Sequence, residues 1–284
     1  MTMTKQTGTT PAGTAWSMCG EGEALVLIHG VGLDQSIWGG QCEGLQRHYS
    51  VITYDMLGHG RSPLQSADAT LEDYAEQLFE LLQHLNISKA HVVGFSMGGL
   101  VARVFALRYP QKLARLVILG SVFNRSDAVR NAILARTEEV ARDGANANLQ
   151  TALERWFSPE YRAASPGQIE RIRELVLGNN PTGYLRAYRL FAGGDNYLAD
   201  QVQNISCPTL VMTGELDPGS TPAMAQELAA KLPDGRCLVM PGQRHMMPME
   251  SPQRVNDALL SFLKSPANNN NSQTQSHLSK EASL

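Results

Sequence analysis

The sequence has few features that would direct the chain to nucleic acid, to a membrane or to export. Its 24 basic and 27 acidic residues give a net charge of −3, so there is no basic excess for binding nucleic acid or anionic lipid. No apolar run approaches the roughly 20 residues that a membrane span needs. Residues 1–11 are polar and threonine-rich and lack the apolar centre of a secretory signal. We therefore expect no nucleic-acid partner and no membrane partner.

Cysteine is scarce, and its spacing is unsuited to a metal site. The chain has 4 cysteines, none in a C-x-x-C pair: Cys19, Cys42, Cys207 and Cys237. Widely spaced cysteines are typical of free thiols in a reducing compartment rather than of disulfides or zinc ligands. We therefore expect a cytoplasmic protein with no bound metal.

What the sequence does contain is an alternation of apolar runs with helix-forming segments. With 284 residues and 43% hydrophobic composition, the chain can build one large core. Continuous apolar runs are typical of parallel strands buried on both faces, and alternation with helices predicts an α/β fold with a mostly parallel central sheet flanked by helices. We expect strands within residues 14–18, 24–28, 51–54, 90–95, 113–119, 208–212 and 237–240. We expect helices within residues 36–48, 70–85, 100–109, 221–231 and 252–263.

The alternation is interrupted once, which suggests an insertion. Residues 123–200 show helical patterns and no convincing strand. We therefore expect a core formed by residues 1–122 and 201–265, with a helical insertion between them. Residues 1–13 are predicted to be a mobile leader. The Asn-, Ser- and Gln-rich residues 266–284 are predicted to be a disordered polar tail.

A strand that ends in Gly94-Phe95-Ser96-Met97-Gly98 and is followed at once by a helix predicts an exposed nucleophile. A sharp strand-to-helix corner lifts the serine hydroxyl away from the backbone, and nearby glycines give the space that the corner needs. The glycine-serine pattern alone is common, so the flanking strand and helix carry this interpretation. Ser96 is the candidate nucleophile.

A serine hydroxyl needs a base, and the base needs a carboxylate to orient it. In a parallel sheet these groups are expected just after the carboxyl ends of strands. Asp217 and His245 occupy such positions, and the chain order Ser, Asp, His fits the strand-corner nucleophile. Glu215 is the alternative acid, but it lies closer to its strand.

The remaining histidines are not expected to transfer protons. His29 is expected to shape the loop that follows residues 24–28, and His59 is expected to be structural. Surface positions are predicted for His48, His84 and His91, and His277 lies in the tail.

Acyl transfer passes through an oxyanion, which needs two preorganised N–H donors. The N–H of Met97 follows from the corner at Ser96. The second donor is expected from the loop after His29-Gly30, as the N–H of Val31.

Taken together, the motifs resemble those of the α/β-hydrolase superfamily. They occur in that family's order across most of the chain, at residues 29–32, 94–99, 214–217 and 242–245. The resemblance implies an α/β-hydrolase fold, a cofactor-free reaction through an acyl-enzyme, and a helical cap at residues 123–200. Many relatives have arginine at the position of Leu57, so this loop is expected to be held differently.

Within that superfamily, the chain is similar to 3-oxoadipate enol-lactonases and related bacterial catabolic hydrolases. Carbon–carbon bond hydrolases of aromatic-ring degradation, carboxylesterases and aminoacrylate-type hydrolases share the same motifs. The finer resemblance therefore favours, but does not single out, a lactone as substrate.

The insertion offers a clue to the substrate because it contains 10 arginines, 10 acidic residues and no lysine. Arg125, Arg186 and Arg189 are candidates for binding a substrate carboxylate, although the equal number of acids also fits solvated helix faces. Trp156 is expected either to pack within the insertion or to line the pocket. Gly32, Leu33 and Met246 are further candidates for contact with substrate.

Three functions remain open at this level. The first is a serine hydrolase that cleaves a small ester or lactone with water. The second is carbon–carbon bond cleavage by the same residues. The third is a non-hydrolytic binding protein on the same scaffold, which would have no need of a complete serine, histidine and aspartate set. No feature of the sequence indicates the oligomeric state.

Overall fold

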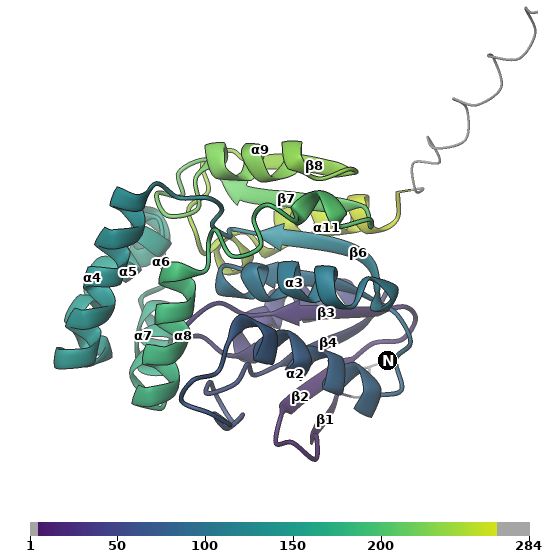
Figure 1. The fold of residues 1–284 in the computed structure, drawn as a ribbon, viewed down its shortest axis with the longest axis horizontal. Helices are drawn as coiled ribbons and strands as arrows, with labels where there is room; N and C mark the ends of the chain where they lie inside the picture. Colours follow the sequence, from purple (N-terminus) through teal and green to yellow (C-terminus); the bar gives the residue numbers. More distant parts are fainter. Residues whose placement is uncertain (1–4, 266–284) are drawn as a thin grey trace, which may run out of the picture.

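The computed structural model describes residues 5–265, which form an eight-stranded sheet with helices on both faces (Figure 1). The strand order is β1-β2-β4-β3-β5-β6-β7-β8. The pairs β1–β2 and β2–β4 are antiparallel, and every other pair is parallel. The strands are β1 Gln6–Thr9, β2 Ala15–Cys19, β3 Ala24–Ile28, β4 Ser50–Tyr54, β5 Ala90–Phe95, β6 Leu113–Leu119, β7 Thr209–Gly214 and β8 Gly235–Met240.

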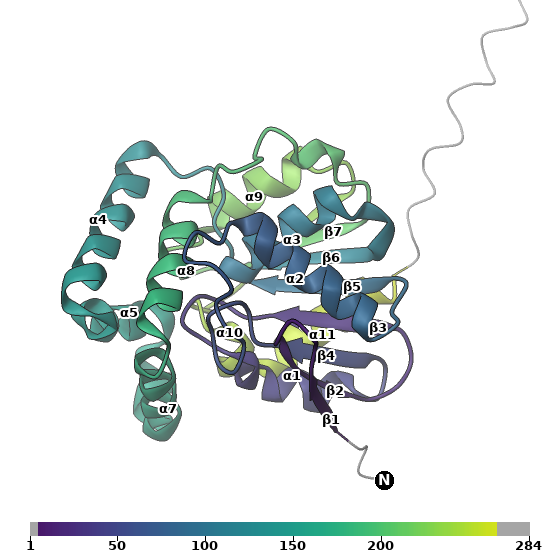
Figure 2. The ribbon, with the colours of Figure 1, turned by 60° about the horizontal axis from the view of Figure 1, so that its bottom comes forward.

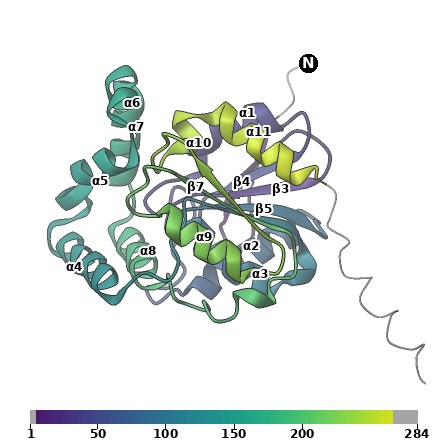
Figure 3. The same ribbon diagram turned by 90° about the horizontal axis from the view of Figure 1, so that it is seen from above.

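Helices cover both faces of this sheet, which explains the continuous apolar runs. Helices α2 and α3 lie on one face, and α1 and α11 lie on the other (Figures 1 and 3). All six residues of β5 are buried as a result. The helices outside the insertion are α1 Gly39–Leu45, α2 Leu71–His84, α3 Met97–Arg108, α9 Pro222–Lys231, α10 Met247–Glu250 and α11 Pro252–Leu263.

The helix predicted at residues 70–85 corresponds to α2, which begins at a strong local capping signal. Thr70 and Asp73 form a capping box at the start of α2, with the Thr70 hydroxyl accepting from the Asp73 N–H and the Asp73 carboxylate accepting from the Thr70 N–H. The helix expected over residues 36–48 is instead a 3₁₀ turn at Gln35–Trp38 followed by the short α1. Three glycines within residues 39–44 make a longer regular helix unfavourable here.

The segment between β6 and β7 is entirely helical or irregular. Its helices lie together beyond the carboxyl ends of the parallel strands (Figures 1 and 2). Buried apolar side chains such as Leu153, Phe157 and Ile172 give these helices a packed interior. They are α4 Asp127–Asp143, α5 Leu149–Trp156, α6 Pro159–Ala164, α7 Pro166–Leu177 and α8 Pro181–Gly193, and we refer to them as the cap.

The prediction of a mobile leader was wrong for residues 5–13. Residues 6–9 form β1, which pairs with β2 at the edge of the sheet. The sequence signal is weak because QTGT lacks apolar alternation and most of its side chains are exposed. Gly8 allows the Trp16 ring to approach, since a Cβ atom at Gly8 would lie 2.7 Å from it. The predicted tail at residues 266–284 lies outside the described residues.

The prediction that His91 is a surface residue was also wrong. His91 lies within β5 and is 5% exposed. Its ring packs edge-on against Tyr49, and its Nε2 lies 3.2 Å from the Glu23 carboxylate. The polar ring is accommodated near the start of the strand because an acidic side chain reaches it from solvent.

Across residues 5–265, no helix combines the length and the apolar character needed to cross a membrane.

Candidate active site

Ser96 forms the corner between β5 and α3 with backbone dihedrals of φ 55° and ψ −117°. This conformation is strained for a residue with a side chain and is found where the surrounding structure enforces it. The surroundings are tight: a Cβ atom on Gly98 would lie 2.5 Å from the carbonyl oxygen of Ile28. Glycine at this position therefore lets α3 start directly against the end of β3.

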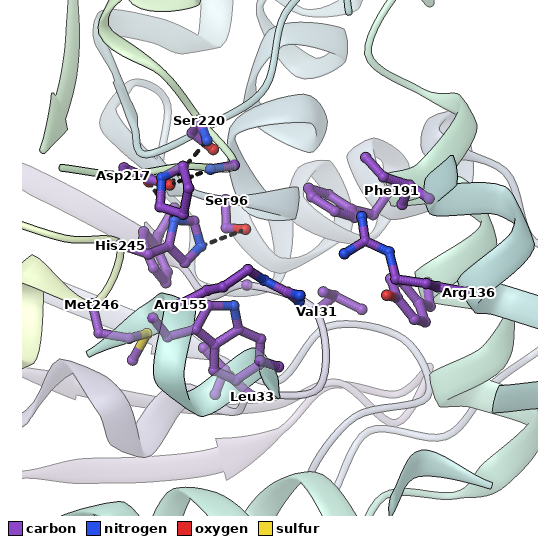
Figure 4. Close-up of a pocket in the computed structure, with 18 of the residues that line it drawn as sticks. Val31, Leu33, Ser96, Arg136, Arg155, Phe191, Asp217, Ser220, His245 and Met246 are labelled. Carbon is purple, nitrogen blue, oxygen red and sulfur yellow. Dashed lines mark hydrogen bonds and ion pairs between the residues drawn. The ribbon is translucent and has the colours of Figure 1, made fainter. Parts of the chain in front are cut away.

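Ser96, His245 and Asp217 form one continuous hydrogen-bonded chain (Figure 4). The Nε2 atom of His245 lies 3.1 Å from the Ser96 Oγ. The Nδ1 atom of His245 lies 2.6 Å from the Asp217 Oδ2. The three residues follow β5, β8 and β7, so the parallel sheet brings together positions up to 149 residues apart in sequence.

The Asp217 carboxylate is buried and well supplied with donors. Its Oδ1 accepts hydrogen bonds from the N–H groups of Gly219 at 2.9 Å and Ser220 at 3.0 Å. Burial alone raises the pKa of this carboxyl, but His245 and the two N–H groups outweigh burial and lower the pKa below its ordinary value. Asp217 is therefore an anion that fixes the Nδ1–H tautomer of His245. The alternative acid, Glu215, instead accepts from the Gly242 N–H on the surface.

The loop after β3 lies against Ser96 and offers a free backbone donor. A Cβ atom on Gly30 would lie 3.1 Å from the Ser96 Cβ, so this loop passes the nucleophile closely. Within residues 5–265 the N–H of Val31 donates no hydrogen bond. Met97 is the first residue of α3, so its N–H has no acceptor within the helix. The two expected oxyanion donors thus come from the residue that follows Ser96 and from the loop that passes close to it.

Two buried histidines hold this loop in place. His29 Nδ1 lies 2.8 Å from the Gly30 carbonyl oxygen, and His29 Nε2 accepts from the Met56 N–H at 2.9 Å. His59 Nδ1 lies 3.0 Å from the Leu57 carbonyl oxygen, and its Nε2 accepts from the Gly32 N–H at 3.1 Å. Both rings therefore need a neutral state with the proton on Nδ1.

The pKa values of these two rings agree with that requirement. Burial lowers the pKa of His29 to about 4. Burial, followed by the repulsion that a protonated His29 would exert, lowers the pKa of His59 to about 3. The two histidines therefore support the loop as neutral groups at pH 7. This matches the structural roles expected for them from sequence.

A cavity of about 100 Å³ opens beside Ser96 between the core and the cap. Five of the residues singled out as substrate or oxyanion contacts line it, namely Val31, Leu33, Arg125, Trp156 and Met246. The Trp156 ring lies 6.4 Å from the His245 ring between centroids, so the end of α5 covers the catalytic chain. Gly32 and Met97 are not among the lining residues.

The proposal that Arg186 and Arg189 bind substrate is not supported by their positions. Arg186 donates to the carbonyl oxygens of Ala69 and Asp68 at 2.6 and 2.9 Å, and so ties α8 to the core. Arg189 pairs with Glu138 at 3.0 Å on the surface of the cap. Both lie on α8, whose cavity-facing side is formed by other residues, including Tyr184 and Tyr188.

Two arginines that the sequence did not single out line the cavity instead. Arg136 comes from α4 and Arg155 from α5. Their guanidinium groups point toward the space in front of Ser96 (Figure 4). The absence of lysine from the cap was the available signal, but no motif in these helices distinguishes an inward arginine from an outward one.

Within residues 5–265 no cluster of three or more His, Cys, Asp or Glu side chains is arranged to hold a metal ion. The arrangement as it stands can activate a serine hydroxyl, orient the base and accept negative charge at two backbone N–H groups.

A family model for the alpha/beta hydrolase fold matches residues 23–252. The chain is 38% identical over 247 residues to the (E)-2-((N-methylformamido)methylene)succinate hydrolase of Acinetobacter baylyi, covering 86% of this chain and 92% of the relative. It is 30% identical over 241 residues to 3-oxoadipate enol-lactonase 2 of the same organism, covering 85% and 88%.

Among solved structures, a malate-bound thermophilic esterase from Thermogutta terrifontis superposes with a TM-score of 0.81 at 31% identity, covering 93% of this chain and 98% of the esterase. These matches confirm the predicted resemblance to enol-lactonase-like hydrolases. The chain belongs to the α/β-hydrolase fold family.

Proposed function

We propose that this protein is a serine hydrolase that cleaves a small ester or lactone through an acyl-enzyme. The observation that carries the proposal is the Ser96–His245–Asp217 hydrogen-bonded chain at the wall of a cavity between the core and the cap. The partners in the reaction are the small-molecule substrate and water. We include a cytoplasmic location in the proposal, because the four cysteines within the described chain are all free thiols.

In the first half of the reaction, Ser96 Oγ attacks the substrate carbonyl carbon while His245 Nε2 takes the serine proton. The bond between carbonyl carbon and leaving oxygen then breaks, and His245 returns the proton to that oxygen. In the second half, water attacks the acyl carbon while His245 takes its proton, the bond between that carbon and Ser96 Oγ breaks, and His245 returns the proton to Oγ as the acid product leaves. Asp217 stabilises the imidazolium that forms in both halves.

The N–H groups of Val31 and Met97 are proposed to bind the oxyanion of each tetrahedral intermediate. One such donor typically contributes about 10²–10³ in rate. His59 supports this arrangement indirectly, because it accepts from the N–H of Gly32, the residue next to Val31.

Relatives favour a substrate that carries a carboxylate. The similar Acinetobacter hydrolase is named for a succinate derivative, the enol-lactonase for a 3-oxoadipate lactone, and the similar esterase was solved with malate. Arg125, Arg136 and Arg155 line the cavity, so its lining includes three positively charged side chains. A carboxylate-bearing ester or enol-lactone is therefore our proposed substrate class.

Carbon–carbon bond hydrolysis is the alternative reaction, because it can use the same three residues. A non-hydrolytic binding protein is disfavoured by the short, aligned contacts on both sides of His245.

The test is Ser96→Ala, with the exposed Ser66→Ala as the matched control. Wild type and control should hydrolyse 4-nitrophenyl acetate and react with a fluorophosphonate probe. We expect Ser96→Ala to lose about 10⁴-fold or more in kcat and to lose labelling. Activity within tenfold of wild type would refute the assignment of the nucleophile. Hydrolysis of vinylogous diketones by wild type, with loss of that activity in Ser96→Ala, would identify carbon–carbon bond cleavage.

A further inference from the structure

Three arginines from separate elements reach the cavity that contains Ser96. Arg125 comes from the segment between β6 and α4, Arg136 from α4 and Arg155 from α5. Figure 4 shows Arg136 and Arg155 approaching the space in front of Ser96 from different sides. The acid that lines the same cavity, Asp217, is engaged by His245, so the remaining charge of the cavity depends on how many of the three arginines have acidic partners.

Arg125 is largely neutralised by the protein. Its Nη2 lies 3.4 Å from the Asp195 carboxylate and also donates to the carbonyl oxygens of Phe191 and Ala192. Neither the Arg125 nor the Asp195 side chain is exposed. Asp195 also pairs with Arg130 at 3.0 Å, so one carboxylate serves two guanidinium groups. The Nε and Nη1 atoms of Arg125 remain buried without a hydrogen-bond partner within residues 5–265.

Arg136 and Arg155 have no carboxylate partner in the described part of the chain. The Nε of Arg136 is buried and makes no hydrogen bond there. Burial, and then the charge of Arg136, lowers the pKa of the Arg155 guanidinium. Of the acids near Arg136 on α4, Glu138 pairs with Arg189 and Glu139 is exposed.

Two unpaired guanidinium groups that share a small cavity repel each other and have lost part of their hydration. Solvated arginines on a helix surface avoid both costs, so that simpler explanation does not fit side chains at a cavity wall. An anionic ligand removes the repulsion and supplies charge-assisted hydrogen bonds at once. A single carboxylate would neutralise one of the two charges, whereas two carboxylates match both.

We propose that Arg136 and Arg155 each bind one carboxylate of the same substrate, so that the natural substrate is a short dicarboxylate bearing the hydrolysable ester or lactone group. This rests on the proposed function and narrows its substrate class. The cavity is small, about 100 Å³, which favours a short carbon chain.

The test uses three esters with the same 4-nitrophenyl leaving group. The acetate has no free carboxylate, the succinate monoester has one, and a monoester of propane-1,2,3-tricarboxylate has two. We expect the wild-type KM to be lowest for the ester with two carboxylates. Arg136→Gln and Arg155→Gln should each raise that KM by about 10- to 100-fold and change the acetate KM by less than about threefold.

Two further variants make the result specific. Arg142→Gln, on the exposed surface of the same helix as Arg136, should behave as wild type with all three esters. Arg155→Lys should recover part of the preference, because lysine keeps the charge but not the planar fork. Equal KM increases for acetate and the two-carboxylate ester would overturn the proposal. So would equal wild-type KM values for the esters with one and two carboxylates.

Binding is measured separately from turnover by calorimetry on Ser96→Ala. Propane-1,2,3-tricarboxylate should bind this variant, and adding Arg136→Gln or Arg155→Gln should weaken the affinity at least tenfold. Absence of binding would overturn the dicarboxylate site even if the acetate is hydrolysed. If wild type neither hydrolyses the acetate nor labels at Ser96, the hydrolase proposal fails, and calorimetry still decides whether the arginines bind dicarboxylates.

Discussion

Acid should destabilise this protein well above the pH at which carboxylates become protonated, because two neutral histidines are buried beneath the oxyanion loop. His29 and His59 are 0% and 1% exposed, and the Nε2 atom of each accepts a backbone N–H. Protonation would place a second N–H against that donor. The folded chain therefore keeps both rings neutral at a pH where the unfolded chain protonates them.

The size of the effect follows from the pKa values. Between an unfolded value of 6.5 and folded values of about 4 for His29 and about 3 for His59, only the unfolded chain binds the two protons. Stability therefore falls as the pH falls, by about 1.4 kcal/mol per pH unit for each ring. From pH 6.5 to 5 the two rings together remove about 3 kcal/mol, a large part of the 5–15 kcal/mol of a typical domain.

Urea unfolding at half-unit steps from pH 7 to 5, followed by circular dichroism, measures this slope. His59→Gln keeps an acceptor for the Gly32 N–H but does not titrate, so its slope should be shallower than that of wild type, by a difference that grows to about 1.4 kcal/mol per pH unit near pH 5. His48→Gln, at an exposed position, is the control and should keep the wild-type slope. Burial also lowers the pKa of His91, but this contribution is common to all three proteins and cancels. Equal slopes for wild type and His59→Gln would refute the reasoning.

Two other substitutions test how the cap and the loop are held. Asp195→Asn removes the carboxylate shared by Arg125 and Arg130, and should lower the free energy of unfolding by roughly 3–5 kcal/mol, measured by urea denaturation. A loss below 1 kcal/mol would show that this buried pair is unimportant. Gly32→Ala adds a Cβ 2.7 Å from the Tyr184 ring at a residue with φ +73°, which should displace the neighbouring Val31 N–H. We expect kcat/KM for 4-nitrophenyl acetate to fall about 100-fold, and an unchanged value would contradict the role of Val31.

The strands of the core could be predicted from the sequence because their signals are local and repeated. Buried parallel strands produce continuous apolar runs, and the structure has strands at each of the seven predicted places. The position of each catalytic candidate then followed from one rule, that parallel strands present their carboxyl ends at the same edge. β1 was not predicted because an exposed edge strand needs no apolar pattern. This strand is held instead by backbone pairing with β2.

The cavity-lining residues of the cap were only partly predictable, because their positions depend on how the cap helices rotate and dock. Arg125 was identified by its place just after a strand, which fixes it relative to the sheet. Arg136 and Arg155 lie in the middle or at the end of helices whose inward face is set by tertiary packing. Arg186 is only 31 residues from Arg155, yet its guanidinium group donates hydrogen bonds to carbonyl groups of the core.

The cap is nevertheless hydrogen-bonded to the segment that carries the catalytic base. The N–H of Met246, next to His245, donates to the Trp156 carbonyl oxygen at 2.9 Å. Glu250 of α10 accepts from the N–H and hydroxyl of Ser158 at 2.9 and 2.7 Å. Arg155 therefore stands one residue from a backbone bond to the loop that carries the base. A carboxylate bound at Arg155 is positioned relative to His245 through these few bonds, which couples recognition of the substrate to the placement of its reacting carbonyl group.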